Sequence, residues 1–126
     1  MSDAEKEPVV QYADNDSEAI RSISHVTRGA QLPAPLVYSV LRNLKGVGYL
    51  LLQALKQLSS GLGRSLNEYT VTEDDGRDPV QSVATATDHL TRAAELATQL
   101  GDELEKAQSA IARQSYKKAP NRELGD

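Results

Sequence analysis

The sequence predicts an all-α protein built on a long antiparallel helical hairpin similar to a coiled coil. The first observation is an apolar seam in the last third of the chain, and the second is an upstream seam with the same spacing of three and four residues. A spacing that averages about 3.5 residues forms one stripe along a helix that packs against another helix. The downstream seam is Val83, Ala86, Leu90, Ala93, Ala97, Leu100, Leu104, Ala107 and Ile111, and the upstream seam is Val37, Leu41, Leu44, Gly48, Leu51, Leu55, Leu58 and Leu62.

The two seams can be paired in one register if the turn is centred on residue 74. The residue numbers of two facing positions then add up to 148, which places Leu51 against Ala97 and Leu55 against Ala93. A large side chain faces a small one in five of the eight layers. Such interdigitation fills the space between two close helices, so the size pattern favours this pairing.

The composition favours one globular or coiled domain without a deep pocket. The chain has 126 residues, of which 39% are hydrophobic and 25% charged, and it lacks Phe, Trp and Cys. Without Phe and Trp, few bulky side chains can form the walls of a substrate site. Without Cys, disulfides and cysteine-based zinc sites are excluded. The sequence shows no basic segment followed by an apolar run, and residues 47–52 are far short of the ~20 residues of a membrane span. We therefore expect a cytoplasmic protein, with leaderless export left open.

We expect one helical domain with a tail at each end. The domain should cover residues 16–116, between a disordered acidic tail over 1–15 and a flexible tail over 117–126. Capping residues and prolines set the boundaries of the helices. The expected helices span residues 17–28, 34–69 and 79–116.

Local signals support each of these helices in turn. The short first helix follows the cap oxygens of residues 14–17 and stops before Gly29. Pro35 suits the first turn of the second helix, whose four glycines leave its continuity open. Asp78 is the expected N-cap of the third helix, and Pro120 prevents that helix from continuing.

The second helix carries more apolar surface than the hairpin can cover. Between Val47 and Leu55 it is nearly apolar all round, which is typical of a helix buried on more than one side. Exposing such a surface invites aggregation, so we expect oligomerisation or a helical protein partner to complete a helical bundle. This predicts a non-enzymatic interaction, assembly or accessory protein. The expected partner-binding residues are Leu36, Val40, Val47, Leu50 and Leu52.

The charge pattern leaves a second interpretation open. Residues 19–67 contain six basic residues and no acidic residue, whereas the third helix is mainly acidic. The basic stripe either pairs with these acidic residues and fixes the register, or binds nucleic acid or an anionic membrane as part of an accessory factor. Acidic neighbours and a net charge of -4 favour pairing. The residues of the anion-binding alternative are Arg42, Lys45, Lys56 and Arg64.

The remaining motifs predict no enzyme, no cofactor and no metal site. An EF-hand loop with Gly76 at its sixth position would need Val71 and Ser82 as first and last ligands, and neither is a carboxylate. The glycine pairs lie in helical patterns and lack the lysine and hydroxyl residue of a phosphate-binding loop. No set of Ser, His and Asp residues is indicated by order or context.

Two resemblances give further alternatives. His89 is followed by Leu90, Arg92 and Ala93, and this segment resembles a histidine phosphotransfer domain, although alanine stands where that family has glycine. The expected shape also resembles small leaderless secreted proteins of the Trp-x-Gly type, in which two long antiparallel helices pair as dimers. This chain lacks Trp-x-Gly, and the family's tail signal, a Tyr followed four residues later by an acidic residue, occurs only inside the turn. The second resemblance is one of shape.

Overall fold

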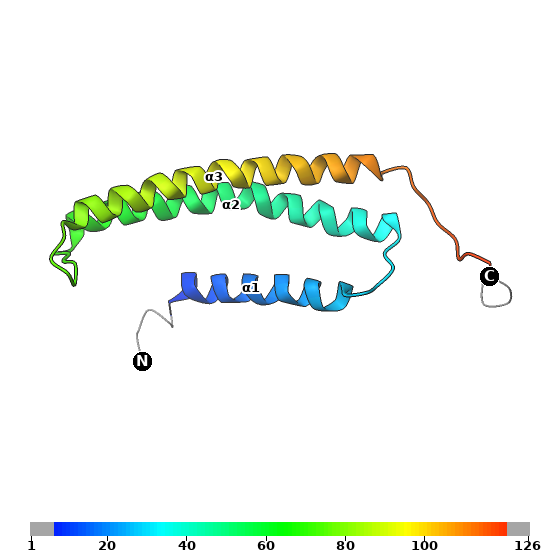
Figure 1. Cartoon of the computed structure of the whole chain (residues 1–126), viewed down its shortest axis with the longest axis horizontal. Helices are drawn as coiled ribbons and strands as arrows, with labels where there is room; N and C mark the ends of the chain where they lie inside the picture. The colour runs from blue at the N-terminus through cyan, green and yellow to red at the C-terminus, as the bar shows by residue number, and fades with distance from the viewer. Residues whose placement is uncertain (1–6, 121–126) are drawn as a thin grey trace. The chain divides into compact units, whose positions relative to one another are not determined.

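The structure is a computed structural model that describes residues 7–120, in which three α-helices are found (Figure 1). These are α1 (Pro8–Thr27), α2 (Ala34–Glu68) and α3 (Pro79–Ala110). The described residues form two compact units, one containing α1 and the other containing α2 and α3. The predicted all-α class is confirmed, and α2 packs against α3. No helix in the described part of the chain is both long and apolar enough to cross a membrane.

Helix α1 begins nine residues earlier than the sequence analysis expects. Pro8 occupies its first turn, where a missing N–H costs no hydrogen bond, and the preceding Glu7 is extended. Gln11 Nε2 donates to Asn15 Oδ1 at 3.2 Å, inside the segment expected to be a disordered tail. No residue of α1 is buried. The expected start depended on the cap oxygens of residues 14–17, which lie inside the helix instead. Residues 1–6 of the expected tail lie outside the described residues.

Helix α2 continues through all four of its glycines, and α3 is shorter than expected. Asp78 caps α3, because its Oδ1 accepts a hydrogen bond from the Val80 N–H at 3.0 Å. The helix ends at Ala110, six residues before the expected end at Tyr116. Residues 112–118 are polar and exposed, so no apolar stripe holds further turns against α2. Of the expected flexible tail, residues 121–126 lie outside the described part.

The contacts between α2 and α3 run in opposite order along the two helices, which lie side by side in Figure 1. Lys45 contacts Glu105, and further along α2 Tyr49 contacts Asp102. The backbones come closest where two glycines face each other. A Cβ atom placed on Gly48 would lie 3.0 Å from the Gly101 backbone nitrogen. At this level the two helices therefore touch with their main chains.

The predicted seam is wrong at four of its seventeen positions, two on each helix. The buried residues of α3 are Ala94, Ala97, Gly101 and Gln108, whereas Leu100 is 50% exposed and Ala107 is also exposed. On α2, Leu51 and Leu58 are 40% and 51% exposed, and their neighbours Leu52 and Ser59 are half-buried instead. The predicted residue is the larger one in two of these four pairs, Leu100 beside Gly101 and Leu58 beside Ser59. At Gly101 the close contact with α2 leaves no room for a larger side chain.

We expect opposite effects from alanine at two neighbouring glycines of α2. Gly48→Ala should lower the free energy of unfolding by about 1–3 kcal/mol, because the added methyl group meets the α3 backbone. Gly46→Ala should raise it by about 0.5–1 kcal/mol, because its Cβ would meet no atom within 4 Å and alanine favours the helix. Urea denaturation followed by circular dichroism measures both values. Equal shifts would contradict the proposed contact.

Candidate interaction surface

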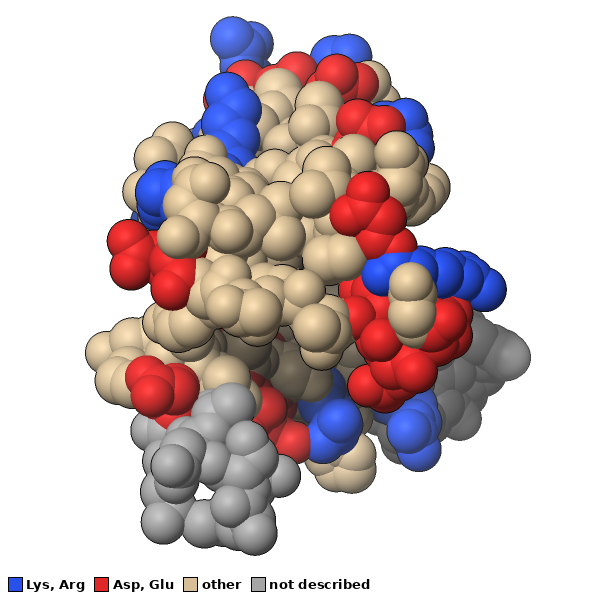
Figure 2. Space-filling model, turned by 90° about the vertical axis from the view of Figure 1, so that its left-hand side faces the viewer, with Lys and Arg blue, Asp and Glu red and all other residues tan. Residues whose placement is uncertain are grey.

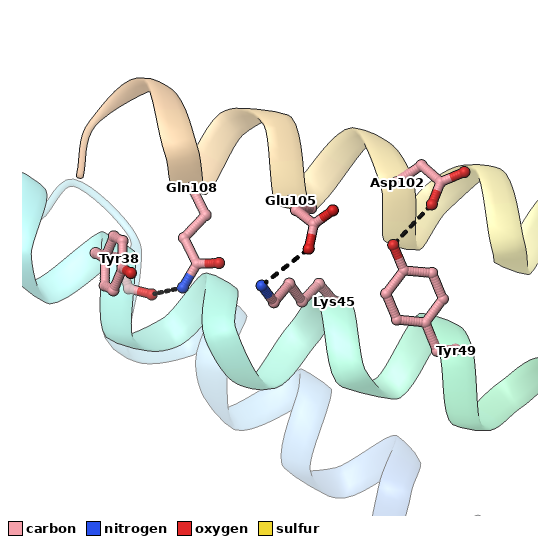
Figure 3. Close-up of polar contacts among 6 residues, drawn as sticks. All are labelled: Tyr38, Lys45, Tyr49, Asp102, Glu105 and Gln108. Carbon is pink, nitrogen blue, oxygen red and sulfur yellow. Dashed lines mark hydrogen bonds and ion pairs between the residues drawn. The ribbon is translucent and has the colours of Figure 1, made fainter.

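One side of the α2–α3 pair is polar, and side chains of α2 bond there to side chains of α3 (Figure 3). Lys45 Nζ lies 3.3 Å from Glu105 Oε1, and the Tyr49 hydroxyl donates to Asp102 Oδ1 at 2.7 Å. The Tyr49 ring also lies over Gly101, where an added Cβ would come within 2.7 Å of the ring. Only glycine at this position lets the tyrosine reach the carboxylate.

A buried side-chain amide makes a further contact between the two helices, nearer the start of α2. Gln108 is 4% exposed, and its Nε2 donates to the backbone oxygen of Tyr38 at 3.3 Å (Figure 3). A buried amide without a partner would destabilise the fold, so this bond compensates for its burial. Within the described residues no buried side-chain nitrogen or oxygen lacks a partner. The sequence analysis missed Gln108 because it took Ala107 as the seam residue.

The contact with Asp102 changes the acidity of Tyr49. The hydrogen bond to Asp102, assisted by desolvation and by the charges of Asp102 and Glu105, raises the pKa of Tyr49 from 10.0 to about 12. The folded state therefore holds the phenolic proton more tightly than the unfolded state. This contribution to stability is fully present below pH 10 and is lost as the pH rises through about 12.

A groove of about 680 Å³ lies between α2 and α3 on the polar side. Lys56 and Glu95 each lie seven residues from a partner in the Tyr49–Asp102 pair, which is two turns along the same side of each helix. Apolar side chains and hydroxyl groups alternate with these charges. The lining residues are Leu52, Leu55, Lys56, Ser59, Ser60, Leu90, Thr91, Ala94, Glu95, Thr98 and Gln99.

The opposite side of the pair is apolar. A rotation of 100° per residue places Leu51 about 160° from Tyr49, and Leu100 about 160° from Asp102. Because Tyr49 and Asp102 meet on one side, these leucines lie on the other. Further exposed apolar residues of each helix lie on that side or, like Leu50 at about 100° from Leu51, at its edge. Leu50 is 73% exposed, and Leu96 is 62% exposed. We call this surface the apolar face, and it consists of Leu36, Val47, Leu50, Leu51 and Leu58 of α2 with Leu96 and Leu100 of α3.

The structure separates the residues that the sequence analysis grouped as partner-binding. Leu36, Val47 and Leu50 belong to the apolar face. Val40 is half-buried. Leu52 lines the groove between α2 and α3, because a two-residue step from Leu50 turns the side chain by about 200°. The analysis confined the surface to the second helix and so missed the contribution of α3. The four-residue spacing of its two leucines was the available signal.

The four residues of the predicted anion-binding stripe have different surroundings. Lys45 pairs with Glu105, and Lys56 lines the groove opposite Glu95. The Arg42 guanidinium carbon lies 5.6 Å from the centre of the Tyr38 ring, a cation–π distance. Arg64 is exposed near the end of α2. Glu103, an expected partner of this stripe, pairs with Lys106 of its own helix at 3.1 Å.

The other polar motifs also have local partners. The exposed His89 has its Nδ1 3.2 Å from Arg92 Nη2. In the acidic turn, Asp75 pairs with Arg77 at 2.7 Å. Across residues 7–120, no group of three or more His, Cys, Asp or Glu side chains is arranged to hold a metal ion.

No family model, curated protein or solved structure matches this chain. A function must therefore be inferred from the surface of the molecule itself. Seen along its long axis from the end where residues 69–78 connect α2 and α3, the surface is uncharged in the middle of the view, and acidic and basic side chains lie towards its edges (Figure 2).

We expect Asp102→Asn to lower the pKa of Tyr49 from about 12 towards 10.0, since the substitution removes the carboxylate charge. Titration of the tyrosinate ultraviolet absorbance measures the change. Tyr49→Phe is the control, and its titration curve should lack the component near 12. A late component that persists in the Tyr49→Phe variant would contradict the assignment.

Proposed function

We propose that the protein is a non-enzymatic assembly or accessory protein, in which α2 and α3 form a coiled-coil-like hairpin that docks on other helices through the apolar face. One observation carries this proposal. Among the hydrophobic residues of the described chain only Ala94 and Ala97 are buried, while leucines of both helices point outward on one side. A helix pair that leaves six of its leucines at least 40% exposed is typical of one layer of a larger bundle.

Energetics favour docking on the apolar face over docking on the polar side. Burying an exposed leucine contributes roughly 1.5–3 kcal/mol, and several leucines lie on the apolar face. Monomeric proteins rarely leave a continuous patch of this kind exposed. The polar side, in contrast, already has internal partners for Lys45 and Tyr49. A partner therefore gains most from contact with the leucines.

We expect Val47→Glu combined with Leu50→Glu to abolish the assembly. The wild-type protein should elute from a native extract in a particle heavier than its own 13.7 kDa, as light scattering on the eluate would show. The double variant should elute at the mass of one chain and retain its helical circular dichroism, because charges on the apolar face prevent its burial. Gln53→Glu combined with Ser60→Glu adds the same charge at exposed positions off the face and should leave the particle unchanged. A wild-type protein that is a single chain in the extract and when purified would contradict the proposal.

The contacts of the basic stripe favour a structural role over nucleic-acid binding. If Arg42, Lys45 and Lys56 act within the fold, their joint replacement by Gln should lower the free energy of unfolding by a few tenths of a kcal/mol per ion pair lost. Neither the wild type nor the variant should then be retained on duplex DNA. Micromolar binding of the wild type that weakens steeply with salt would instead support the accessory-factor alternative.

A further inference from the structure

We propose that the apolar face is covered by a second copy of this chain, so that two α2–α3 pairs stack face to face as a four-helix bundle. In this dimer α2 of one copy lies over α3 of the other. The inference rests on the proposed function and names the partner of the same surface. Three observations carry it: the partial burial of the internal leucines, the exposed area of the face and the net charges of the two helices.

The α2–α3 pair buries its internal leucines only in part, because eight of them are half-buried and none is fully buried. Within the described residues no large side chain is fully buried, and the buried positions of α3 are two alanines, a glycine and a glutamine. A layer of helices becomes stable by burying its apolar side against another layer. The exposed leucines of α2 and α3 are positioned to supply that core when a second layer is added.

The area of the apolar face matches what a stable dimer needs. Its seven side chains are each between 37% and 73% exposed. At roughly 100 Å² each they offer about 700 Å² per copy, close to the ~800 Å² per partner of a standard stable interface. A two-fold axis makes such a contact with the same residues on both sides, so one apolar face is sufficient for both partners.

The charges select the way in which the two layers stack. Helix α2 contains four basic residues and one acidic residue, whereas α3 contains five acidic and two basic residues. Many of these charges lie on the polar side, away from the stacked faces, so they act through the net charge of each helix and not as direct contacts. Stacking α2 on the α2 of the second copy brings two helices of like net charge together, whereas stacking α2 on α3 brings helices of opposite net charge together. The two-fold axis then runs along the helices, and the two α2 helices point in the same direction.

Sedimentation equilibrium of the purified full chain tests the identity of the partner. We expect twice the mass of the 13.7 kDa chain. Leu50→Glu combined with Leu96→Glu should halve that mass while the circular dichroism stays helical. Gln53→Glu combined with Gln99→Glu, at exposed polar positions, is the matched control and should remain dimeric.

A purified wild type that stays monomeric at high micromolar concentration overturns the inference, whether its face binds another segment of the chain or a different protein. In that case the proposed function still stands if the protein elutes from the native extract in a particle heavier than one chain. If it elutes there as a single chain, the proposed function and the inference both fail. A dimer that survives the Leu50 and Leu96 substitutions also overturns the inference, because it must use another surface.

Distances between spin labels test the stacking. The chain has no cysteine, so single cysteines at the exposed positions Ser39, Gln53 and Gln57 of α2 can each carry one label per copy. With parallel α2 helices, the distance between the two copies' labels should be nearly the same at all three positions. If α2 lies on α2, the two α2 helices are antiparallel. The axial separation between the two labels then changes by about 3 Å for each residue along the helix, because each copy contributes one helical rise. That result would overturn the stacking.

Discussion

The contact between Gly48 and Gly101 sets the distance between α2 and α3. A Cβ atom on Gly48 would come within 3.1 Å of backbone atoms of both Gly101 and Ala97, so the main chains leave no room for side chains at that level. Small residues therefore line the buried stripe of α3, and leucines next to that stripe turn out of it. One steric constraint thus creates both the close helix pair and the apolar face.

The two sides of the pair contribute to different levels of structure. On the polar side, Tyr49 and Lys45 bond to carboxylates of α3, and such exposed contacts contribute only a few tenths of a kcal/mol each while fixing the register. On the apolar side each buried leucine contributes more than an exposed ion pair. Contacts within the chain therefore align the helices, and in the proposed dimer the second copy covers the leucines that remain exposed.

The sequence was sufficient for the helical class but not for the rotation of each helix. Repeated apolar spacing predicts helices, and the excess of leucine on α2 pointed to Leu50 as a surface residue. Hydrophobicity could not decide between Leu100 and Gly101, because the preference for glycine arises from the Tyr49 ring of α2, which a Cβ atom would meet. The early start of α1 at Pro8 was missed for another reason, since the cap oxygens of residues 14–17 suggested a later start. The rotation of α3 about its own axis decides whether Leu96 and Leu100 are exposed, so the contribution of α3 to the apolar face was not predicted.

The dependence of stability on protein concentration tests the central claim most directly. If two copies complete one core, unfolding is coupled to dissociation, and the midpoint of thermal unfolding must rise with concentration. Circular dichroism melts of the purified chain from low micromolar to high micromolar concentration measure this midpoint. We expect a steady rise over that range. A midpoint that stays constant, with the helices folded at the lowest concentration, would show that the single chain is stable by itself and would contradict the account.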